Sequence, residues 1–252
     1  MEAIPPHQTY CEVFAGAAWV FFKKPESKVE IINDINADLT NLYRCAKYHL
    51  TELVMQFRWM LVARDEFDRF LKTPADTLTD IQRAARFFYL AKTSFGARIV
   101  KPTFGIAATA GPRLNLLRIE EELSEAHLRL ARVFIECRPY DQVIQRFDRA
   151  GTFFYVDPPY WNCESDYGEG IFGREDFGRL ASLLAAVKGK FLLSLNDTSG
   201  VRETFANFRI QPVKTRYTIS GSKKQEAFEL LISNYKLSTD VGWSLKPRQR
   251  PR

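Results

Sequence analysis

Two short apolar runs and one periodic segment occupy the first fifty positions of the chain. The runs Thr9–Gly16 (TYCEVFAG) and Val29–Ile35 (VEIINDI) predict two buried strands, the first of which leads into a glycine-containing turn. Between them AAWVFFKK is compatible with a helix, and apolar residues at helical spacing across Asn36–Leu53 predict an amphipathic helix. This order of strand, turn, helix, strand and acid is typical of the first half of a doubly wound nucleotide-binding unit.

Strand-like runs are absent between Glu52 and Leu130, where helical periodicity dominates and Leu114–Arg132 predicts a further helix, with the glutamates 120–122 on its outer surface. The interval Ile81–Arg118 contains seven basic residues, five interleaved aromatic residues and no acidic residue. A basic stretch is usually a solvated face, but this length without an acid favours contact with a polyanion. We therefore interpret residues 52–130 as an inserted, mainly helical subdomain that contacts a nucleic acid.

Strands and helices alternate again after Leu130. Apolar runs predict three strands and two intervening helices, at Val133–Cys137, Gln142–Arg149, Thr152–Val156, Arg174–Val187 and Lys190–Asp197. Two further runs that flank Gly221–Lys224 predict a terminal antiparallel hairpin. The fold class is therefore α/β, with a Rossmann-like sheet of four to five parallel strands built from residues 1–51 and 131–238. Residues 239–252 are predicted to be a basic, disordered tail.

Composition and charge narrow the class of protein. With 252 residues, 46% hydrophobic and 13% aromatic content, the chain can bury a sizeable core, which excludes a disordered protein. A formal charge of +6 favours a polyanionic partner. The cysteines and histidines are scattered, so we expect no metal site. The chain has no signal peptide and no bilayer-length apolar run, so we expect a cytoplasmic protein with reduced thiols and no membrane partner.

The residues Asp157-Pro158-Pro159-Tyr160 carry the most chemical information. They directly follow the apolar run Gly151–Val156, at the carboxyl end of a predicted buried strand. The Asp157 carboxylate and the Pro158 carbonyl can each accept a hydrogen bond from an exocyclic amino group, while Tyr160 offers a flat face to a base. The same four residues also fit a plain turn that ends a strand. Taken alone, they leave a turn and a nucleobase site equally open.

The first turn has the features of a nucleotide-cofactor site. Such a site needs close backbone approach after the first strand, which Gly16 allows, with Phe14 beside the ligand. It also needs a carboxylate for the ribose hydroxyls after the second strand. Asp34 lies 18 residues beyond Gly16, close to the spacing of about 20 that is typical of this role. Each signal is weak alone, but the pair followed by a strand ending in D-P-P-Y is strong.

These motifs together resemble the Dam-type, alpha-group DNA adenine-N6 methyltransferases, in which a cofactor motif, a target-recognition insertion and D-P-P-Y follow in this order. The matching segments lie within Ile4–Tyr235 and are YCEVFAG, NDIN, DPPY, FLLSLND and AFELLISNY. D-P-P-Y rather than S-P-P-Y favours the adenine N6 over the cytosine N4 amino group. The resemblance implies a Rossmann-like AdoMet-dependent methyltransferase sheet, S-adenosyl-L-methionine (AdoMet) as cofactor and double-stranded DNA as partner. A monomer and a homodimer both stay open.

The resemblance also implies roles for particular residues. The catalytic residues would be Asp157, Pro158 and Tyr160, which would orient the amino group of a flipped adenine for direct methyl transfer without a metal. The cofactor-binding residues would be Tyr10, Glu12, Phe14, Ala15, Gly16, Ala17, Asp34, Ile35, Tyr140 and Asp157. Trp161–Gly173 would be a mobile loop that closes over the base. The candidate DNA contacts, each also explicable as a solvated charge, are Arg86, Lys92, Arg98 and Lys101.

Three positions depart from the family pattern. An aromatic and Gly-Gly-Lys stretch, which in the family precedes the segment matching Ile4–His7 and helps to hold AdoMet, is not present. Either the start given to the chain is too far downstream, or the cofactor site is more open. Ala18 replaces the second glycine of F-x-G-x-G. Pro139-Tyr140 replaces an Asp-Phe pair whose Asp in the family bonds the cofactor adenine. Tyr140 could still stack on that adenine, but the acid is lost unless Asp141 substitutes for it. These departures leave two alternatives, a DNA-binding relic with weak or no turnover and an RNA or protein amino-group methyltransferase.

Overall fold

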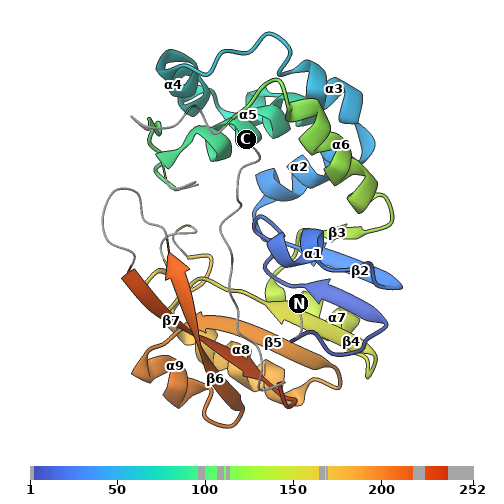
Figure 1. The fold of residues 1–252 in the computed structure, drawn as a ribbon, viewed down its shortest axis with the longest axis vertical. Coiled ribbons are helices and arrows are strands. Elements are labelled where there is room, and N and C mark those ends of the chain that lie inside the picture. Colours follow the sequence, from blue (N-terminus) through green and yellow to red (C-terminus); the bar gives the residue numbers. More distant parts are fainter. Residues whose placement is uncertain are drawn as a thin grey trace.

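A seven-stranded mixed sheet forms the centre of the part of the chain that the structure describes (Figure 1). This structure is a computed structural model, and it describes residues 3–95, 100–106, 111, 114–164, 168, 170–217 and 225–237. The strands are β1 (Thr9–Glu12), β2 (Val29–Asn33), β3 (Phe134–Glu136), β4 (Thr152–Val156), β5 (Lys190–Asn196), β6 (Arg209–Tyr217) and β7 (Gln225–Ser233). Their order in the sheet is β3-β2-β1-β4-β5-β7-β6.

The first five strands in this order are parallel, and the last two close the sheet as an antiparallel pair. β1 pairs in parallel with both β2 and β4, so the strand order reverses at β1. β7 runs antiparallel to both β5 and β6. The predicted α/β fold with a parallel sheet and a terminal antiparallel hairpin is therefore confirmed. The predicted turn at Gly221–Lys224 lies outside the described residues.

Successive strand residues face two different cores, because side chains in a strand alternate between the faces of a sheet. Tyr10, Ile32, Phe153 and Leu192 belong to one core, whereas their neighbours Cys11, Ile31, Phe154 and Leu193 belong to the other. The first face is covered by α1 (Trp19–Lys23), α2 (Ala37–Tyr48) and α6 (Ile119–Leu130). The second is covered by α7 (Tyr140–Phe147), α8 (Arg174–Ala186) and α9 (Ser199–Thr204). Burial on both faces explains why these strands read as continuous apolar runs.

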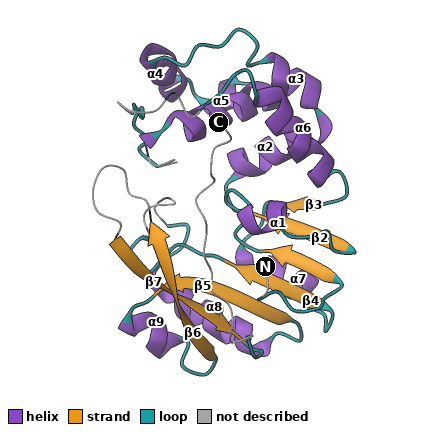
Figure 2. Cartoon of the chain, in the orientation of Figure 1, coloured by secondary structure: helices purple, strands orange, loops and turns teal. Residues whose placement is uncertain are grey.

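The remaining helices gather with α2 and α6 at the top of the view in Figure 2. They are α3 (Leu50–Met55), α4 (Arg64–Lys72), the 3-10 turn η1 (Ala75–Thr77) and α5 (Asp80–Thr93). Their apolar side chains, such as Leu53, Phe67 and Leu90, share one core with α2 and the first face of the sheet. The helices of residues 50–130 thus rest on the sheet domain through a common apolar core.

Two helix predictions were wrong in their bounds. The helix expected over Asn36–Leu53 is divided, because His49 takes the non-helical angles φ −133° and ψ 42° and separates α2 from α3. The helix expected from Leu114 begins only at Ile119, after a turn in which the Arg118 N–H donates to the Asn115 carbonyl. The short helix α9 was not predicted at all. No described helix is long and apolar enough to cross a membrane.

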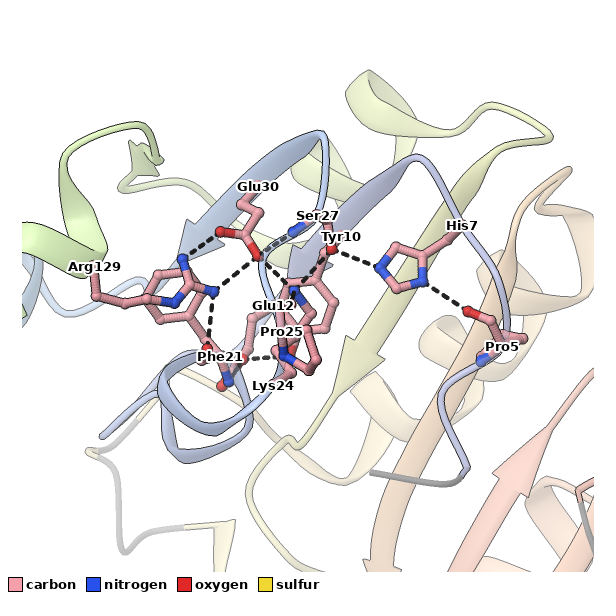
Figure 3. A network of polar contacts seen from close by, with 10 residues as sticks. All are labelled: Pro5, His7, Tyr10, Glu12, Phe21, Lys24, Pro25, Ser27, Glu30 and Arg129. Atoms are coloured by element: carbon pink, nitrogen blue, oxygen red, sulfur yellow. Dashed lines mark hydrogen bonds and ion pairs between the residues drawn. The ribbon is translucent and has the colours of Figure 1, made fainter.

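A buried charge network fixes the segment that leads from the first turn into β2 (Figure 3). Glu30 of β2 accepts hydrogen bonds from Lys24, which follows α1, and from Arg129 of α6. Burial alone would raise the pKa of Glu30, but these two cations hold it below its usual value. The Arg129 guanidinium also lies 3.8 Å from the centre of the Phe21 ring and donates to the Phe21 carbonyl. Because each buried charge is paired, the network is tolerated in the core and anchors α1 against α6.

Candidate active site

Three predicted site residues follow three adjacent strands at the carboxyl edge of the sheet. Glu12 of β1 is in register with Ile32 of β2 and with Tyr155 of β4. Phe14, Asp34 and Asp157 each come two residues after this level, beyond the ends of β1, β2 and β4. Ligands of open α/β sheets bind beyond the carboxyl ends of the strands, where the strand order reverses, and β1 is that point here.

The turn after β1 is held by hydrogen bonds from both sides. Gly16 has φ +48°, and no atom lies within 4 Å of the position where a Cβ would stand, so the backbone faces open space. Its carbonyl accepts from the Tyr43 hydroxyl at 2.5 Å, and its N–H donates to Asp34 at 2.9 Å. The second Asp34 oxygen accepts from the Asn36 N–H at 2.9 Å. Burial raises the pKa of Asp34, while these two donors oppose that rise.

Ala18, which replaces the second glycine of the family pattern, also has a left-handed backbone. Its φ is +50°, and it immediately precedes α1. A non-glycine residue in this region costs roughly 1–2 kcal/mol. The turn therefore keeps a glycine-like conformation despite the alanine, at the expense of some local strain.

Tyr10 and Glu12 lie behind the surface that a ligand could touch. Tyr10 has no exposed surface, and Glu12 is only 2% exposed. Glu12 accepts hydrogen bonds from the Tyr10 hydroxyl at 2.5 Å and from the Phe21 N–H at 3.0 Å. Burial, with a smaller effect from Asp157, raises the pKa of Glu12 to about 8, although both donors act in the opposite direction. In this arrangement the buried Glu12 carboxylate accepts from the backbone of α1.

Aromatic side chains form one wall beside the first turn. The rings of Phe14 and Tyr140 are stacked with their centres 5.6 Å apart, and Phe172 lies 5.8 Å from each. The Tyr140 hydroxyl donates to Asp176 of α8 at 3.1 Å. Ile35, which follows β2, is 42% exposed. Phe172 belongs to the segment that follows D-P-P-Y, so that segment is anchored on two of the predicted cofactor residues.

Asp157 emerges from β4 next to a second carboxylate. Both prolines that follow it are buried, while Asp157 itself is partly exposed. Burial, followed by the charge of Glu229 on β7, raises the pKa of Asp157 to about 7. The Tyr160 hydroxyl donates to Glu229 at 3.0 Å. The D-P-P-Y loop thus places an acid that can change its protonation state near neutral pH at the end of the central strands.

Trp161 fixes the far end of this loop. Asn196 of β5 accepts from the Trp161 N–H and donates to the Trp161 carbonyl, each at 2.9 Å. The centres of the Trp161 and Phe177 rings lie 4.8 Å apart. The Arg174 guanidinium lies 3.9 Å from the centre of the Trp161 indole. A Cβ at Gly200 of α9 would lie 2.1 Å from the indole Cζ2, so only glycine fits beneath it.

Asn196, Gly200 and Glu229 were assigned no function from the sequence. The segments FLLSLND and AFELLISNY, which contain Asn196 and Glu229, were recognised as family matches and were the signal that could have indicated a role. Gly200 carries no sequence signal of its own. Tyr167 of the predicted mobile loop lies outside the described residues.

The four predicted DNA contacts are not equally available. Arg86 donates to the Phe70 carbonyl at 2.7 Å, and Lys92 forms an ion pair with Glu122 at 2.9 Å. Lys101 is exposed, with a left-handed φ of +47°. Arg98 lies outside the described residues. Among the described candidates, Lys101 is therefore the one that the protein itself does not visibly engage through a hydrogen bond or ion pair.

The basic interval Ile81–Arg118 is partly neutralised by acids from other parts of the chain. Besides Lys92, Arg83 pairs with Asp38 at 3.2 Å, and Arg118 pairs with Glu121 at 2.8 Å. These acids come from a neighbouring helix or from the next helical turn. The lack of acidic residues within the interval therefore overstates its free positive charge.

Two surface hollows lie away from the carboxyl edge. One, of about 280 Å³, is bounded by Glu26, Ser27, Lys28, Glu30, Leu128, Arg129 and Arg132. The other, of about 430 Å³, is bounded by Arg44, Lys47, Tyr48, Ala131, Arg132, Val133, Phe134 and Ile135. Neither is lined by a predicted site residue.

The mixed sheet with its antiparallel edge is consistent with the class of AdoMet-dependent methyltransferases, and comparison with known proteins gives the family. The family profile of D12 class N6 adenine-specific DNA methyltransferases matches residues 1–219. The chain therefore belongs to this family of adenine-specific DNA methyltransferases, which use AdoMet as methyl donor and act on DNA.

Several curated relatives are similar along nearly their whole length. The type II methyltransferase M.CviBI of Paramecium bursaria Chlorella virus NC1A is 26% identical over 238 residues, covering 90% of each chain. The type II methyltransferase M.MjaIII of Methanocaldococcus jannaschii is 27% identical, covering 90% of this chain and 88% of the relative. The DNA adenine methylase of Escherichia coli K12 is 26% identical, with 90% and 87% covered. The suspected resemblance to Dam-type enzymes is confirmed.

Proposed function

We propose that this protein methylates the N6 amino group of an adenine that is flipped out of duplex DNA, at the carboxyl edge of its sheet. The observation that carries the proposal is that Phe14, Asp34 and Asp157 each follow, by two residues, the same register level of the adjacent parallel strands β1, β2 and β4. A nucleotide cofactor bound along β1 and β2 would then lie beside an acid that can hold the acceptor nitrogen. Flipping is required because the amino group of a stacked base cannot reach a recessed carboxylate.

In this proposal Asp157 and Pro158 orient the amino group. The carboxylate of Asp157 and the carbonyl of Pro158 each accept one N6 hydrogen, which turns the nitrogen lone pair towards the incoming methyl group, while Tyr160 stacks on the base. When bound, AdoMet supplies an activated methyl group, so a new N–C bond forms as the donor S–C bond breaks. Asp157, with a pKa of about 7, can take the proton that N6 then releases. Alignment of this kind can contribute about 7–11 kcal/mol.

The residues of the first turn fit the cofactor that the family uses. The open space in front of Gly16 leaves room for a ligand, and each Asp34 oxygen retains a lone pair beyond the hydrogen bond that it already accepts. We propose that Phe14, Ala15, Gly16, Ala17, Asp34, Ile35 and Tyr140 contact AdoMet. Tyr10 and Glu12 are proposed to support this surface from behind.

The assay that tests the proposal follows labelled methyl transfer from AdoMet to duplex DNA, RNA and protein, with hydrolysis of the product to identify the modified base. We expect N6-methyladenine in duplex DNA, and sequencing of the modified bases would give the target site. N4-methylcytosine, or transfer only to RNA or protein, would contradict the proposal. Retained DNA binding without any transfer would instead favour a DNA-binding relic of the same fold.

We propose that residues 52–130 recognise the target DNA, with Lys101 as a phosphate contact. Replacing Lys101 with alanine should weaken DNA binding and lower the slope of log affinity against log salt by about 0.9, because one phosphate contact is lost. Lys92→Ala is the matched control, since Lys92 is already paired with Glu122 and its removal should leave the slope nearly unchanged. Fluorescence anisotropy between 50 and 200 mM salt, roughly the range over which such contacts are resolved, measures both slopes. Equal slopes for Lys101→Ala and the unmodified protein would remove Lys101 from the interface.

A further inference from the structure

Two polar residues stand directly opposite each other where β5 and β7 border the D-P-P-Y loop. Asn196 of β5 and Glu229 of β7 are register partners in the antiparallel ladder. Each reaches the loop with its side chain. Asn196 exchanges two hydrogen bonds with the backbone of Trp161, and Glu229 accepts one from the Tyr160 hydroxyl. Two consecutive loop residues are thus held by two facing residues of the sheet.

The hydrogen bond to Glu229 restrains the orientation of the Tyr160 ring, on which stacking of a base depends. A tyrosine ring is free to turn about its side-chain torsions unless its hydroxyl is held, and a base stacks well only on a ring with a fixed plane. The Tyr160 oxygen is 3.0 Å from a carboxylate on a paired strand, so the sheet sets the ring direction. Asn196 sets the direction of the next peptide and thereby the exit of the chain from the loop.

The negative charge of Glu229 also affects the protonation of Asp157. Among the described residues, Glu229 on β7 and Glu12 on β1 are the acids that interact electrostatically with Asp157. After burial, the charge of Glu229 is the cause that raises the pKa of Asp157. Removing that charge should make Asp157 lose its proton more readily, so any activity that needs the Asp157 carboxylate should persist to lower pH.

We propose that Asn196 and Glu229 form a positioning pair that aligns the catalytic loop, with Glu229 fixing the ring of Tyr160 against the base. The inference rests on the proposed function, because it assigns the loop to base binding. Neither residue touches the reacting atoms in this account. Glu229 acts through Tyr160 and Asp157, and Asn196 acts through the backbone of Trp161.

A double-mutant cycle separates this role from simple structural support. Glu229→Ala and Tyr160→Phe should each lower kcat for DNA methylation about tenfold, with little change in the KM for AdoMet, since both remove the same charge-assisted hydrogen bond. The double variant should lose no more than either single one. Asn196→Ala should likewise lower kcat more than it changes the KM for AdoMet. Full additivity of the two single effects would overturn the assignment of Glu229.

The pH profile of kcat/KM supplies a second readout. Glu229→Gln keeps an acceptor for Tyr160 but removes the charge, so the acid limb should move to lower pH while the rate at pH 8 stays close to that of the unmodified enzyme. Glu203→Gln, which removes an exposed acid on α9, is the control and should not move the limb. An unmoved limb in Glu229→Gln contradicts the inference. Absence of transfer in the unmodified protein would instead contradict the proposed function itself, and the two failures are therefore distinct.

Discussion

The Asp157→Asn protein should transfer methyl groups about a hundredfold to a thousandfold more slowly and yet be more stable than the unmodified protein at pH 8. The loss of rate follows because a neutral amide is a weaker acceptor for the N6 hydrogens and cannot take the released proton, and preorganised electrostatic groups contribute on this scale. The gain in stability follows because the folded protein holds Asp157 in surroundings that disfavour its charge. Asparagine has the same shape and carries no charge.

The sign of the stability effect follows from the pKa of Asp157. Folding raises that pKa from about 3.8 to about 7, so the folded state binds the proton more tightly than the unfolded state does. The resulting stabilisation is complete below the unfolded value of 3.8 and is lost as the pH rises through 7. The full linkage would amount to about 4 kcal/mol, and partial exposure to solvent reduces our expectation to about 1–2 kcal/mol at pH 8.

Thermal unfolding at two pH values measures this trade-off. At pH 8 the Asp157→Asn protein should melt higher by about 2–4 °C for each kcal/mol, and at pH 4 the two proteins should melt at nearly the same temperature. Single-turnover methyl transfer on the same preparations gives the rate. An Asn variant with normal rate would contradict the catalytic role of Asp157, and equal melting at pH 8 would contradict the raised pKa.

Replacing Gly200 with alanine should damage the site without touching any residue of the D-P-P-Y motif. The new Cβ would stand 2.1 Å from the Trp161 indole, which is itself enclosed by Phe177 and Arg174. Either Trp161 or α9 must move, and overpacking of this kind costs about 1–3 kcal/mol of folding free energy. Because Trp161 directly follows Tyr160, we also expect a loss of methyl-transfer rate on the order of a hundredfold, as for other ångström-scale displacements of a catalytic group.

Gly178 of α8 provides the matched control. It lies in a helix with no atom within 4 Å of the position of a Cβ, so Gly178→Ala should raise the free energy of unfolding by about 0.4–1 kcal/mol and leave the rate unchanged. Urea unfolding and single-turnover assays of both variants give the comparison. If Gly200→Ala behaves like Gly178→Ala in both measurements, Trp161 does not position the loop.

Local sequence patterns were sufficient for the strands and for the central acids. Runs such as Thr152–Val156 are apolar on both faces of the strand, so their burial is already encoded in consecutive residues. Gly16 and Asp34 could be proposed as cofactor-site residues from the sequence because such roles depend on distance from the end of a strand, and that distance can be counted along the chain. Helix bounds were less predictable, since the break at His49 is set by its backbone angles and carries no glycine or proline signal.

By itself, then, the sequence determined the α/β sheet with its closing hairpin, the family, and the acid at the end of β4. Only the tertiary structure decided which residues hold the loop that follows that acid. Asn196 reaches Trp161 across 35 residues and Glu229 reaches Tyr160 across 69, through a strand register that no local pattern reveals. The tertiary structure also decides which charges are neutralised, because Glu122, which pairs with Lys92, is 30 residues away in the chain. Local periodicity records whether a position is buried, whereas partners distant in the chain meet only when the elements pack.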